Sequence, residues 1–181
     1  MVAAANTGAN SHYDIVIVGG GMVGISLALL LRAQQPWNIL LIEAQELASS
    51  DGPVSGAYSS SFDARSTALS WSSKNIYQSI GLWPQLKKHL SAIAQIHVSD
   101  RGHVGMTRID AGDANVDALG YVVENQLLGS VLLNQLTKID IQLLGSCKLE
   151  TIEPLASGMR LQLQQADKDL DRKSTSELQS L

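Results

Sequence analysis

The fold is decided near the N-terminus by the stretch Asp14-Ile15-Val16-Ile17-Val18-Gly19-Gly20-Gly21-Met22-Val23-Gly24. A β-branched apolar run leads into a cluster of glycines, and an apolar segment with helical spacing follows. A second apolar run ends in Glu43, 19 residues after Gly24. This order predicts a right-handed βαβ unit with a parallel strand pair. Its three expected elements are a strand at 13–18, a helix at 22–34 and a strand at 38–43.

The glycine spacing predicts a dinucleotide site. Gly19 allows the tight turn out of the strand, Gly21 lets a pyrophosphate approach bare backbone, and Gly24 lets helix and strand pack closely. The phosphates are then expected at the helix N-terminus. Glu43 is placed to accept hydrogen bonds from the adenosine ribose, and its charge disfavours NADP. The motif does not choose between FAD and NAD, and its alternative is a βαβ unit whose glycines serve packing alone.

Composition narrows the class of protein. The 181 residues are 45% hydrophobic and 17% charged with a net charge of −4, which fits a soluble globular domain. No basic stripe is present to bind phosphates, so we expect no nucleic-acid partner. The single cysteine, Cys147, excludes an internal disulfide and a multi-cysteine metal site. The N-terminus lacks the pattern of a secretory signal, and a cytoplasmic location is the default.

Downstream of the βαβ unit, helical and strand periods follow one another. A polar loop rich in Ser and Gly covers 44–62, and Ser70 is the expected cap of the next helix. The period changes to two in an antiparallel hairpin at 93–110, which lies outside a parallel sheet. The other expected elements are helices at 71–80 and 83–90, a strand at 121–124 followed by a helix with an apolar face from Leu127 to Leu136, and strands at 139–144, 148–154 and 159–164.

Two histidines invite a metal interpretation that the pattern does not favour. His97 and His103 flank the hairpin turn that contains Asp100. An alternating hairpin places such residues at a turn for ordinary reasons, and no third ligand is close in the sequence. We therefore expect no metal site. No Ser/His/Asp or paired-carboxylate arrangement is visible either, so the catalytic residues stay unassigned.

Several segments together resemble the N-terminal part of FAD-dependent aromatic hydroxylases, which are flavoprotein monooxygenases. They are the glycine stretch with Glu43, Asp63-Ala64-Arg65-Ser66-Thr67-Ala68-Leu69, His97-Val98-Ser99-Asp100-Arg101-Gly102-His103 and Gly120-Tyr121-Val122-Val123-Glu124. The second and third are the more discriminating, because many flavoproteins and dehydrogenases share the glycine motif. Within the family, the chain is most similar to the 2-polyprenyl-6-methoxyphenol hydroxylases of ubiquinone biosynthesis.

The resemblance implies an α/β fold: a Rossmann-like FAD-binding domain with part of an antiparallel substrate-domain sheet, as in glutathione-reductase-like flavoproteins. It implies FAD as cofactor, with NAD(P)H as co-substrate and O2 consumed in hydroxylating a polyprenyl-phenol. Arg65 is implied to lie against FAD, and its alternative is a surface ion pair with Asp63. Glu124 is a second implied contact, with helix capping beside Asn125 as its alternative. The complete set of implied cofactor-binding residues is Gly19, Gly21, Met22, Val23, Gly24, Glu43, Ala44, Arg65 and Glu124.

The resemblance covers only the first part of such a protein. Family members are roughly twice this length and carry later Asp-Gly and Gly-Asp motifs that this sequence lacks. We therefore expect a truncated flavoprotein, with 1–12 a flexible leader, 13–165 the N-terminal part of the FAD-binding domain and 166–181 a polar tail. A ubiquinone-biosynthesis protein complex and the inner membrane face, contacted peripherally, are the expected partners. An NAD-binding dehydrogenase domain and a non-catalytic truncated relative remain the alternatives.

Overall fold

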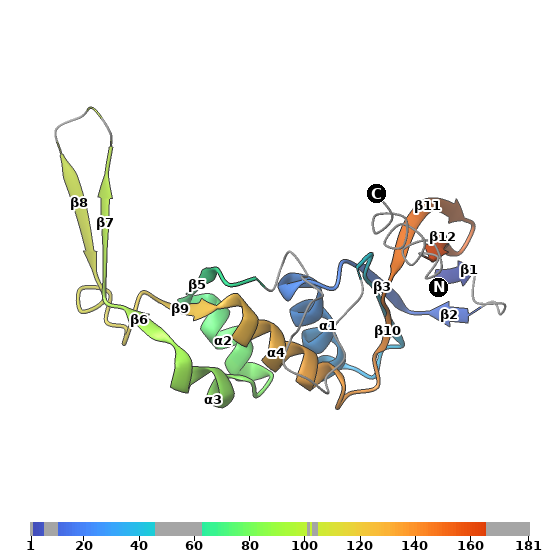
Figure 1. Cartoon of the computed structure of the whole chain (residues 1–181), viewed down its shortest axis with the longest axis horizontal. Coiled ribbons are helices and arrows are strands. Elements are labelled where there is room, and N and C mark those ends of the chain that lie inside the picture. The colour runs from blue at the N-terminus through green and yellow to red at the C-terminus, as the bar shows by residue number, and fades with distance from the viewer. Residues whose placement is uncertain (1, 6–10, 46–62, 101, 103–104, 166–181) are drawn as a thin grey trace, which may run out of the picture. The chain divides into compact units, whose positions relative to one another are not determined.

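The structure is a computed structural model that describes residues 2–5, 11–45, 63–100, 102 and 105–165 (Figure 1). The chain divides into two compact units. Unit 1 combines 1–59 with 140–181, and unit 2 is the continuous segment 60–139. Among the helices of the described residues, none is long and apolar enough to cross a membrane.

Unit 1 contains the predicted βαβ arrangement. Strand β3 (Ile15–Val18) pairs in parallel with β4 (Ile39–Ile42), and helix α1 (Met22–Gln34) connects them and packs against both. Strand β10 (Gln142–Leu144) adds to the other side of β4, again in parallel, so that the sheet order is β10-β4-β3. The parallel pair and its helix confirm the prediction from the glycine stretch, with strand boundaries shorter by one or two residues.

A second sheet in unit 1 differs from the sequence expectation. Strand β12 (Gly158–Gln165) pairs with β11 (Cys147–Leu155) on one side and with β1 (Val2–Ala5) on the other, and β1 also pairs with β2 (Ser11–Tyr13). Residues 1–12 were expected to be a flexible leader, and the structure describes β1 and the first two residues of β2 in this range. The backbone of β1 supplies the ladder partners that an edge strand β12 would otherwise lack.

The core of unit 1 lies on both faces of β4, whose four residues are all buried. Leu40 and Ile42 belong to a cluster between the parallel sheet and the strands of the second sheet, together with Tyr13, Cys147, Leu161 and Leu163. Since side chains alternate along a strand, Ile39 and Leu41 point to the opposite face, where α1 packs with Ile25, Ala28 and Leu29 buried. Burial on both faces explains the unbroken apolar run Ile39-Leu40-Leu41-Ile42.

Unit 2 is built on an antiparallel sheet. Strand β9 (Gly120–Glu124) lies between β5 (Ser66–Ser70) and β6 (Ser91–Ile93). Helix α2 (Trp71–Ser79) begins at Ser70, whose side chain accepts the Ser73 N–H as predicted for a cap. The chain continues through α3 (Trp83–Leu86) and a 3-10 turn (Lys87–His89), and α4 (Asn125–Leu136) follows β9. Strand β9 pairs antiparallel with both of its neighbours and is not part of the parallel sheet β10-β4-β3.

The predicted hairpin is present but shorter than 93–110. Strands β7 (Gln95–Ser99) and β8 (Met106–Asp110) pair antiparallel, while Ile93 belongs to β6 in the sheet of β9. Figure 1 shows the hairpin extending away from the other elements of unit 2. His97 lies opposite Arg108 in the ladder. His103 lies outside the described residues, as do most of the predicted loop 44–62 and the tail 166–181.

Candidate functional site

The glycine turn between β3 and α1 is held by backbone contacts. The Gly19 N–H donates to the Ile42 carbonyl (2.8 Å), and Gly19 has a φ of +110°, which favours glycine. A Cβ at Gly24 would lie 1.8 Å from the Gly19 carbonyl oxygen, so no side chain fits there without displacing backbone. The turn therefore requires glycine at both positions, in agreement with the predicted roles in turning and packing.

Glu43 is bound to the same turn. Its Oε2 accepts the Gly20 N–H at 2.7 Å, and its Oε1 accepts the Gln45 N–H at 2.9 Å. Its own backbone is fixed because its N–H donates to the Leu144 carbonyl and its carbonyl accepts the Cys147 N–H. The half-buried carboxylate thus has a set position beside the turn. Each oxygen accepts one backbone hydrogen bond, which leaves acceptor capacity for ligand hydroxyls.

Gly20 was not among the predicted site residues. Besides donating to Glu43, it is buried, and a Cβ there would lie 3.0 Å from the Glu43 Cβ. A larger residue would therefore push the carboxylate away from the turn. The available signal was the run of three glycines, of which only two fit the motif spacing.

The N-terminus of α1 offers donors and a favourable dipole. Gly21 occupies the N-cap position without a side-chain cap, and the first turn holds no acidic residue. The first N–H groups of a helix have no intrahelical partner, and with the helix dipole they favour an anion. Met22 and Val23 stand in this first turn, and Val23 is 83% exposed. Ala44 is exposed directly after Glu43. A pyrophosphate beside a ribose fits this donor and acceptor set.

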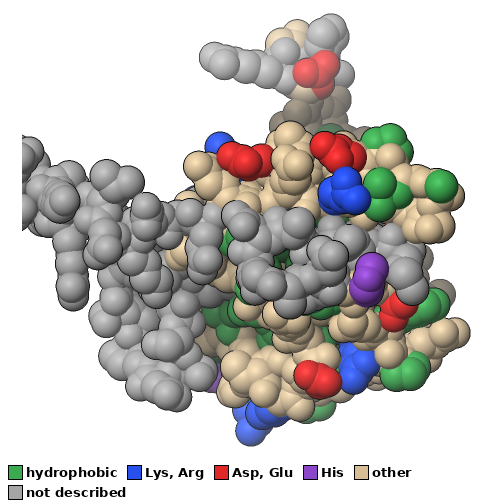
Figure 2. Space-filling model, turned by 90° about the vertical axis from the view of Figure 1, so that its right-hand side faces the viewer, with side chains coloured by type: hydrophobic (Ala, Val, Ile, Leu, Met, Phe, Trp, Pro, Cys, Tyr) green, Lys and Arg blue, Asp and Glu red, His purple; other side chains and the backbone are tan. Residues whose placement is uncertain are grey.

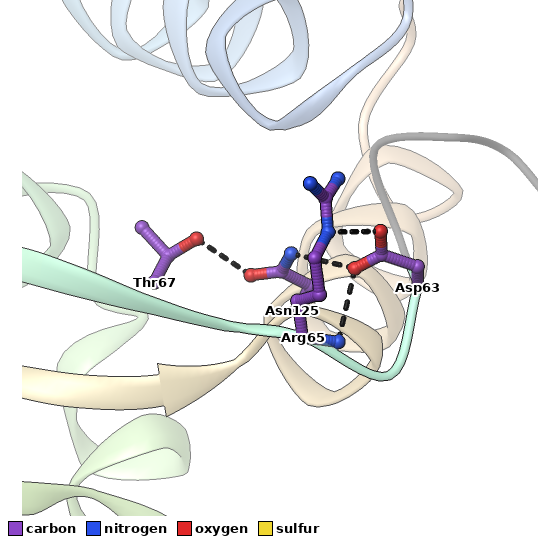
Figure 3. A network of polar contacts seen from close by, with 4 residues as sticks. All are labelled: Asp63, Arg65, Thr67 and Asn125. Carbon is purple, nitrogen blue, oxygen red and sulfur yellow. Dashed lines mark hydrogen bonds and ion pairs between the residues drawn. The ribbon is translucent and has the colours of Figure 1, made fainter.

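Arg65 lies in unit 2 and belongs to a network with Asp63, Asn125 and Thr67 (Figure 3). Its Nε and its backbone N–H both donate to the Asp63 carboxylate. Its side chain is 76% exposed. The ion pair weighed as an alternative for Arg65 is therefore present. It engages one edge of the guanidinium, whose terminal nitrogens point away from the other residues drawn in Figure 3.

Asp63 is kept ionised by its neighbours. Desolvation raises the pKa of its carboxyl, but hydrogen bonds from the Arg65 N–H, the Asn125 amide and the Arg65 side chain outweigh this and hold the pKa below its ordinary value. The charge of Arg65 acts in the same direction. The carboxylate is therefore a stable anchor for the guanidinium at neutral pH.

The structure does not bear out the helix-capping alternative for the side chain of Glu124. It is the N-cap residue of α4, yet its side chain makes no capping hydrogen bond, and it is exposed at the end of β9 opposite Ser66. The side chain of the neighbouring Asn125 forms hydrogen bonds with Thr67 and Asp63. The structure thus brings Gly19, Gly24 and Glu43 together in unit 1, and it places Arg65 and Glu124 in unit 2.

Comparison with known families identifies the class of protein. The model of the family described as "FAD dependent oxidoreductase" matches residues 14–162, most of the chain. The chain belongs to the FAD-dependent oxidoreductases. Membership of this FAD-dependent family makes FAD the cofactor class and decides against the NAD-dehydrogenase alternative.

Curated relatives of the chain support the predicted resemblance. The chain is 29% identical to the ubiquinone hydroxylase UbiL of Rhodospirillum rubrum, covering 70% of this chain and 27% of that protein. It is 29% identical to the ubiquinone biosynthesis monooxygenase COQ6 of Caenorhabditis elegans (76% and 30%). It is 32% identical to the 3-demethoxyubiquinol 3-hydroxylase of Escherichia coli (76% and 34%). The chain spans about a third or less of the length of these relatives.

Solved structures of flavin enzymes share the fold. The OxyS anhydrotetracycline hydroxylase of Streptomyces rimosus matches with a TM-score of 0.65 at 15% identity, covering 83% of this chain and 28% of that one. The flavin-dependent monooxygenase PieE, solved with FAD and substrate, matches with a TM-score of 0.63 at 16% identity (90% and 27%). The predicted α/β fold of a flavoprotein monooxygenase, represented by its N-terminal part, is therefore confirmed.

Proposed function

We propose that this chain is the FAD-binding part of a NAD(P)H- and O2-dependent monooxygenase that hydroxylates a polyprenylated phenol in ubiquinone biosynthesis. The observation that carries the proposal is the glycine turn, in which Gly20 donates to Glu43 beside an uncapped helix N-terminus. This arrangement suits the ADP end of a flavin dinucleotide. The names of the curated relatives support the substrate class.

In this proposal, different residues of unit 1 contact different parts of ADP. Gly19, Gly21 and Gly24 keep the backbone open to the pyrophosphate, and the first amides of α1, at Met22 and Val23, donate to it. Glu43 accepts the adenosine ribose hydroxyls, with Ala44 next to it. Its negative charge excludes a 2′-phosphate at this position.

Two further cofactor contacts are proposed from the resemblance, and both residues lie in unit 2. Arg65 offers the terminal nitrogens of its guanidinium to phosphate or ribitol oxygens. Glu124, at the end of β9, is the second contact on this unit. When bound, FAD supplies the redox chemistry of hydroxylation, and the protein binds and orients it.

The proposed partners follow from the substrate class. A polyprenyl-phenol is carried by a membrane, so we propose a cytoplasmic protein with peripheral contact at the inner membrane face. A ubiquinone-biosynthesis complex is the corresponding protein partner. We propose neither a nucleic-acid partner nor a metal. Among the described residues that Figure 2 draws in colour, acidic and basic side chains are interspersed, with no gathered patch of Lys and Arg.

The test is a competition experiment that separates the two ends of FAD. The purified chain is titrated with FAD, and the shift of the flavin absorbance gives the dissociation constant. We expect ADP to displace FAD and FMN to compete poorly, because the described glycine site matches the ADP half. Equal competition by FMN and ADP, or an unchanged flavin spectrum, would overturn the proposal.

The reaction is tested separately in cells. A host strain that lacks its own ubiquinone hydroxylase receives the gene that encodes this chain, in the form found in the source genome. The hydroxylated polyprenyl-phenol is then measured. Restored product supports the monooxygenase. FAD binding without restored product would favour the alternative of a non-catalytic flavin-binding relative.

A further inference from the structure

Asn125 is the one buried polar residue among those that the structure describes, with 4% exposure. It is the first residue of α4, and its backbone N–H donates to the Arg65 carbonyl at 2.9 Å. Its side-chain oxygen and nitrogen contact Thr67 at 2.6 Å and Asp63 at 3.0 Å. A buried amide is costly unless its hydrogen bonds are made, so these partners explain how it is tolerated.

The chemistry of the partners fixes the orientation of the amide. The Asp63 carboxylate is held ionised and can only accept, so the NH2 of Asn125 must face it. The Asn125 oxygen then faces Thr67, whose hydroxyl must be the donor. Hydrogen bonds therefore run in one direction, from Thr67 to Asn125 and from Asn125 to Asp63.

This chain of hydrogen bonds ends on the residue that holds Arg65. Asp63 Oδ1 accepts from Asn125 and from the Arg65 N–H, which leaves Oδ2 to accept the Arg65 Nε. A guanidinium is planar, so fixing Nε limits the directions in which its terminal nitrogens can point. These nitrogens point away from the network in Figure 3, on a side chain that is largely exposed.

We infer that Asn125 is a positioning residue for cofactor binding: it holds the Asp63 carboxylate, which in turn fixes the direction of the Arg65 guanidinium, the group that we propose contacts FAD. The inference rests on the proposed function, because it needs Arg65 to contact FAD. It assigns to the start of α4 a role beyond packing. An apolar residue of similar size would serve packing alone, and it would leave Asp63 with one donor fewer.

The test is a double-mutant cycle on FAD affinity. Asn125→Leu is made in the wild-type chain and in Arg65→Ala, and the FAD dissociation constant of each is measured. In the wild type we expect Asn125→Leu to weaken FAD binding about five-fold, as for one lost hydrogen bond. In the Arg65→Ala background the same change should have less than about a two-fold effect, because its target is gone.

A second pair of variants keeps the test valid if Asn125→Leu does not fold. Thr67→Val removes the hydroxyl with little change of shape and should weaken FAD binding, whereas Thr67→Ser retains the hydroxyl and should restore it. Ser130→Ala, which removes an exposed hydrogen bond farther along α4, is the control for a general effect on the helix. Its FAD affinity should equal that of the wild type.

The outcomes separate the inference from the proposed function. Equal effects of Asn125→Leu with and without Arg65 would overturn the positioning role, while the role of Arg65 would stand. A loss of thermal stability without a change in FAD affinity would also overturn it. If Arg65→Ala itself leaves FAD affinity unchanged, the proposed contact of Arg65 fails, and the inference fails with it.

Discussion

Replacing Gly24 with alanine tests the most constrained position of the glycine turn. The new Cβ would lie 1.8 Å from the Gly19 carbonyl oxygen and 3.1 Å from its carbon. Real Cβ atoms essentially never approach heavy atoms below 3.0 Å, so the turn and α1 must separate by more than 1 Å. The Gly19 N–H is bonded to Ile42 on the buried strand β4, and α1 packs on that strand. Neither side of the contact is free to move.

The magnitude follows from two opposing effects. Forcing extra volume into a packed site costs about 3 kcal/mol at the upper end of the usual range, which suits a clash between backbone atoms. Alanine gains about 1 kcal/mol over glycine in a helix. We therefore expect Gly24→Ala to lower the free energy of unfolding of unit 1 by about 2 kcal/mol. The displaced amides should also weaken FAD binding at least about ten-fold, the effect of one lost hydrogen bond to a charged group.

Urea unfolding followed by circular dichroism and FAD titration give the two values. Gly81→Ala is the matched control, because its Cβ would meet no atom within 4 Å while its φ of +73° still favours glycine. That control should lose about 1 kcal/mol from backbone strain and bind FAD normally. A Gly24→Ala variant with wild-type stability and FAD affinity would refute the reasoning from close approach.

Three further predictions concern single side chains. Glu43→Gln should weaken the hydrogen bonds at the turn by about 1 kcal/mol and relax the exclusion of a 2′-phosphate, which competition between ADP and 2′-phosphorylated ADP would measure. Hydrogen bonds from the Gly112 N–H and a glutamine amide hold the pKa of Asp110 below its ordinary value, so its stabilising effect exists above about pH 4 and is lost as the pH falls. Wild type and Asp110→Asn should therefore differ in the hydrogen-exchange protection of the hairpin at neutral pH, and this difference should vanish as the pH falls below about 4. A difference that persists at about pH 2 would contradict the stabilising role of the Asp110 carboxylate. Burial raises the pKa of the Cys147 thiol, so a thiol reagent at pH 8 should label it far more slowly in buffer than in urea, and equal labelling rates would contradict its burial.

The elements that the sequence predicted well depend on local patterns. Strand β3, helix α1 and strand β4 follow from apolar periods and glycine punctuation within one stretch. Strand β1 was missed because its residues Val2-Ala3-Ala4-Ala5 show no alternation, its antiparallel partner β2 is only three residues long, and its parallel partner β12 is far away in the sequence. Pairing of this kind leaves no local signal.

The candidate site shows the same limit. Gly19, Gly24 and Glu43 were predicted because their spacing itself encodes the geometry of a turn beside a strand end. The contacts of Asn125 with Thr67 and Asp63 join residues about 60 positions apart, and no motif spans them. The position of Asn125 at the start of a helix with an apolar face was the signal available for its role, and this position is equally typical of an exposed capping residue.

The division into a continuous and a discontinuous unit has a consequence for folding during synthesis. Residues 60–139 form unit 2 from one segment, so all of its strand partners are available before the last part of the chain is made. Strand β4, by contrast, gains its neighbour β10 only after unit 2 has been synthesised. Strand β1 likewise gains its parallel partner β12 only after that. Since distant pairings form slowly, unit 2 should fold first and the glycine turn should gain its full support last.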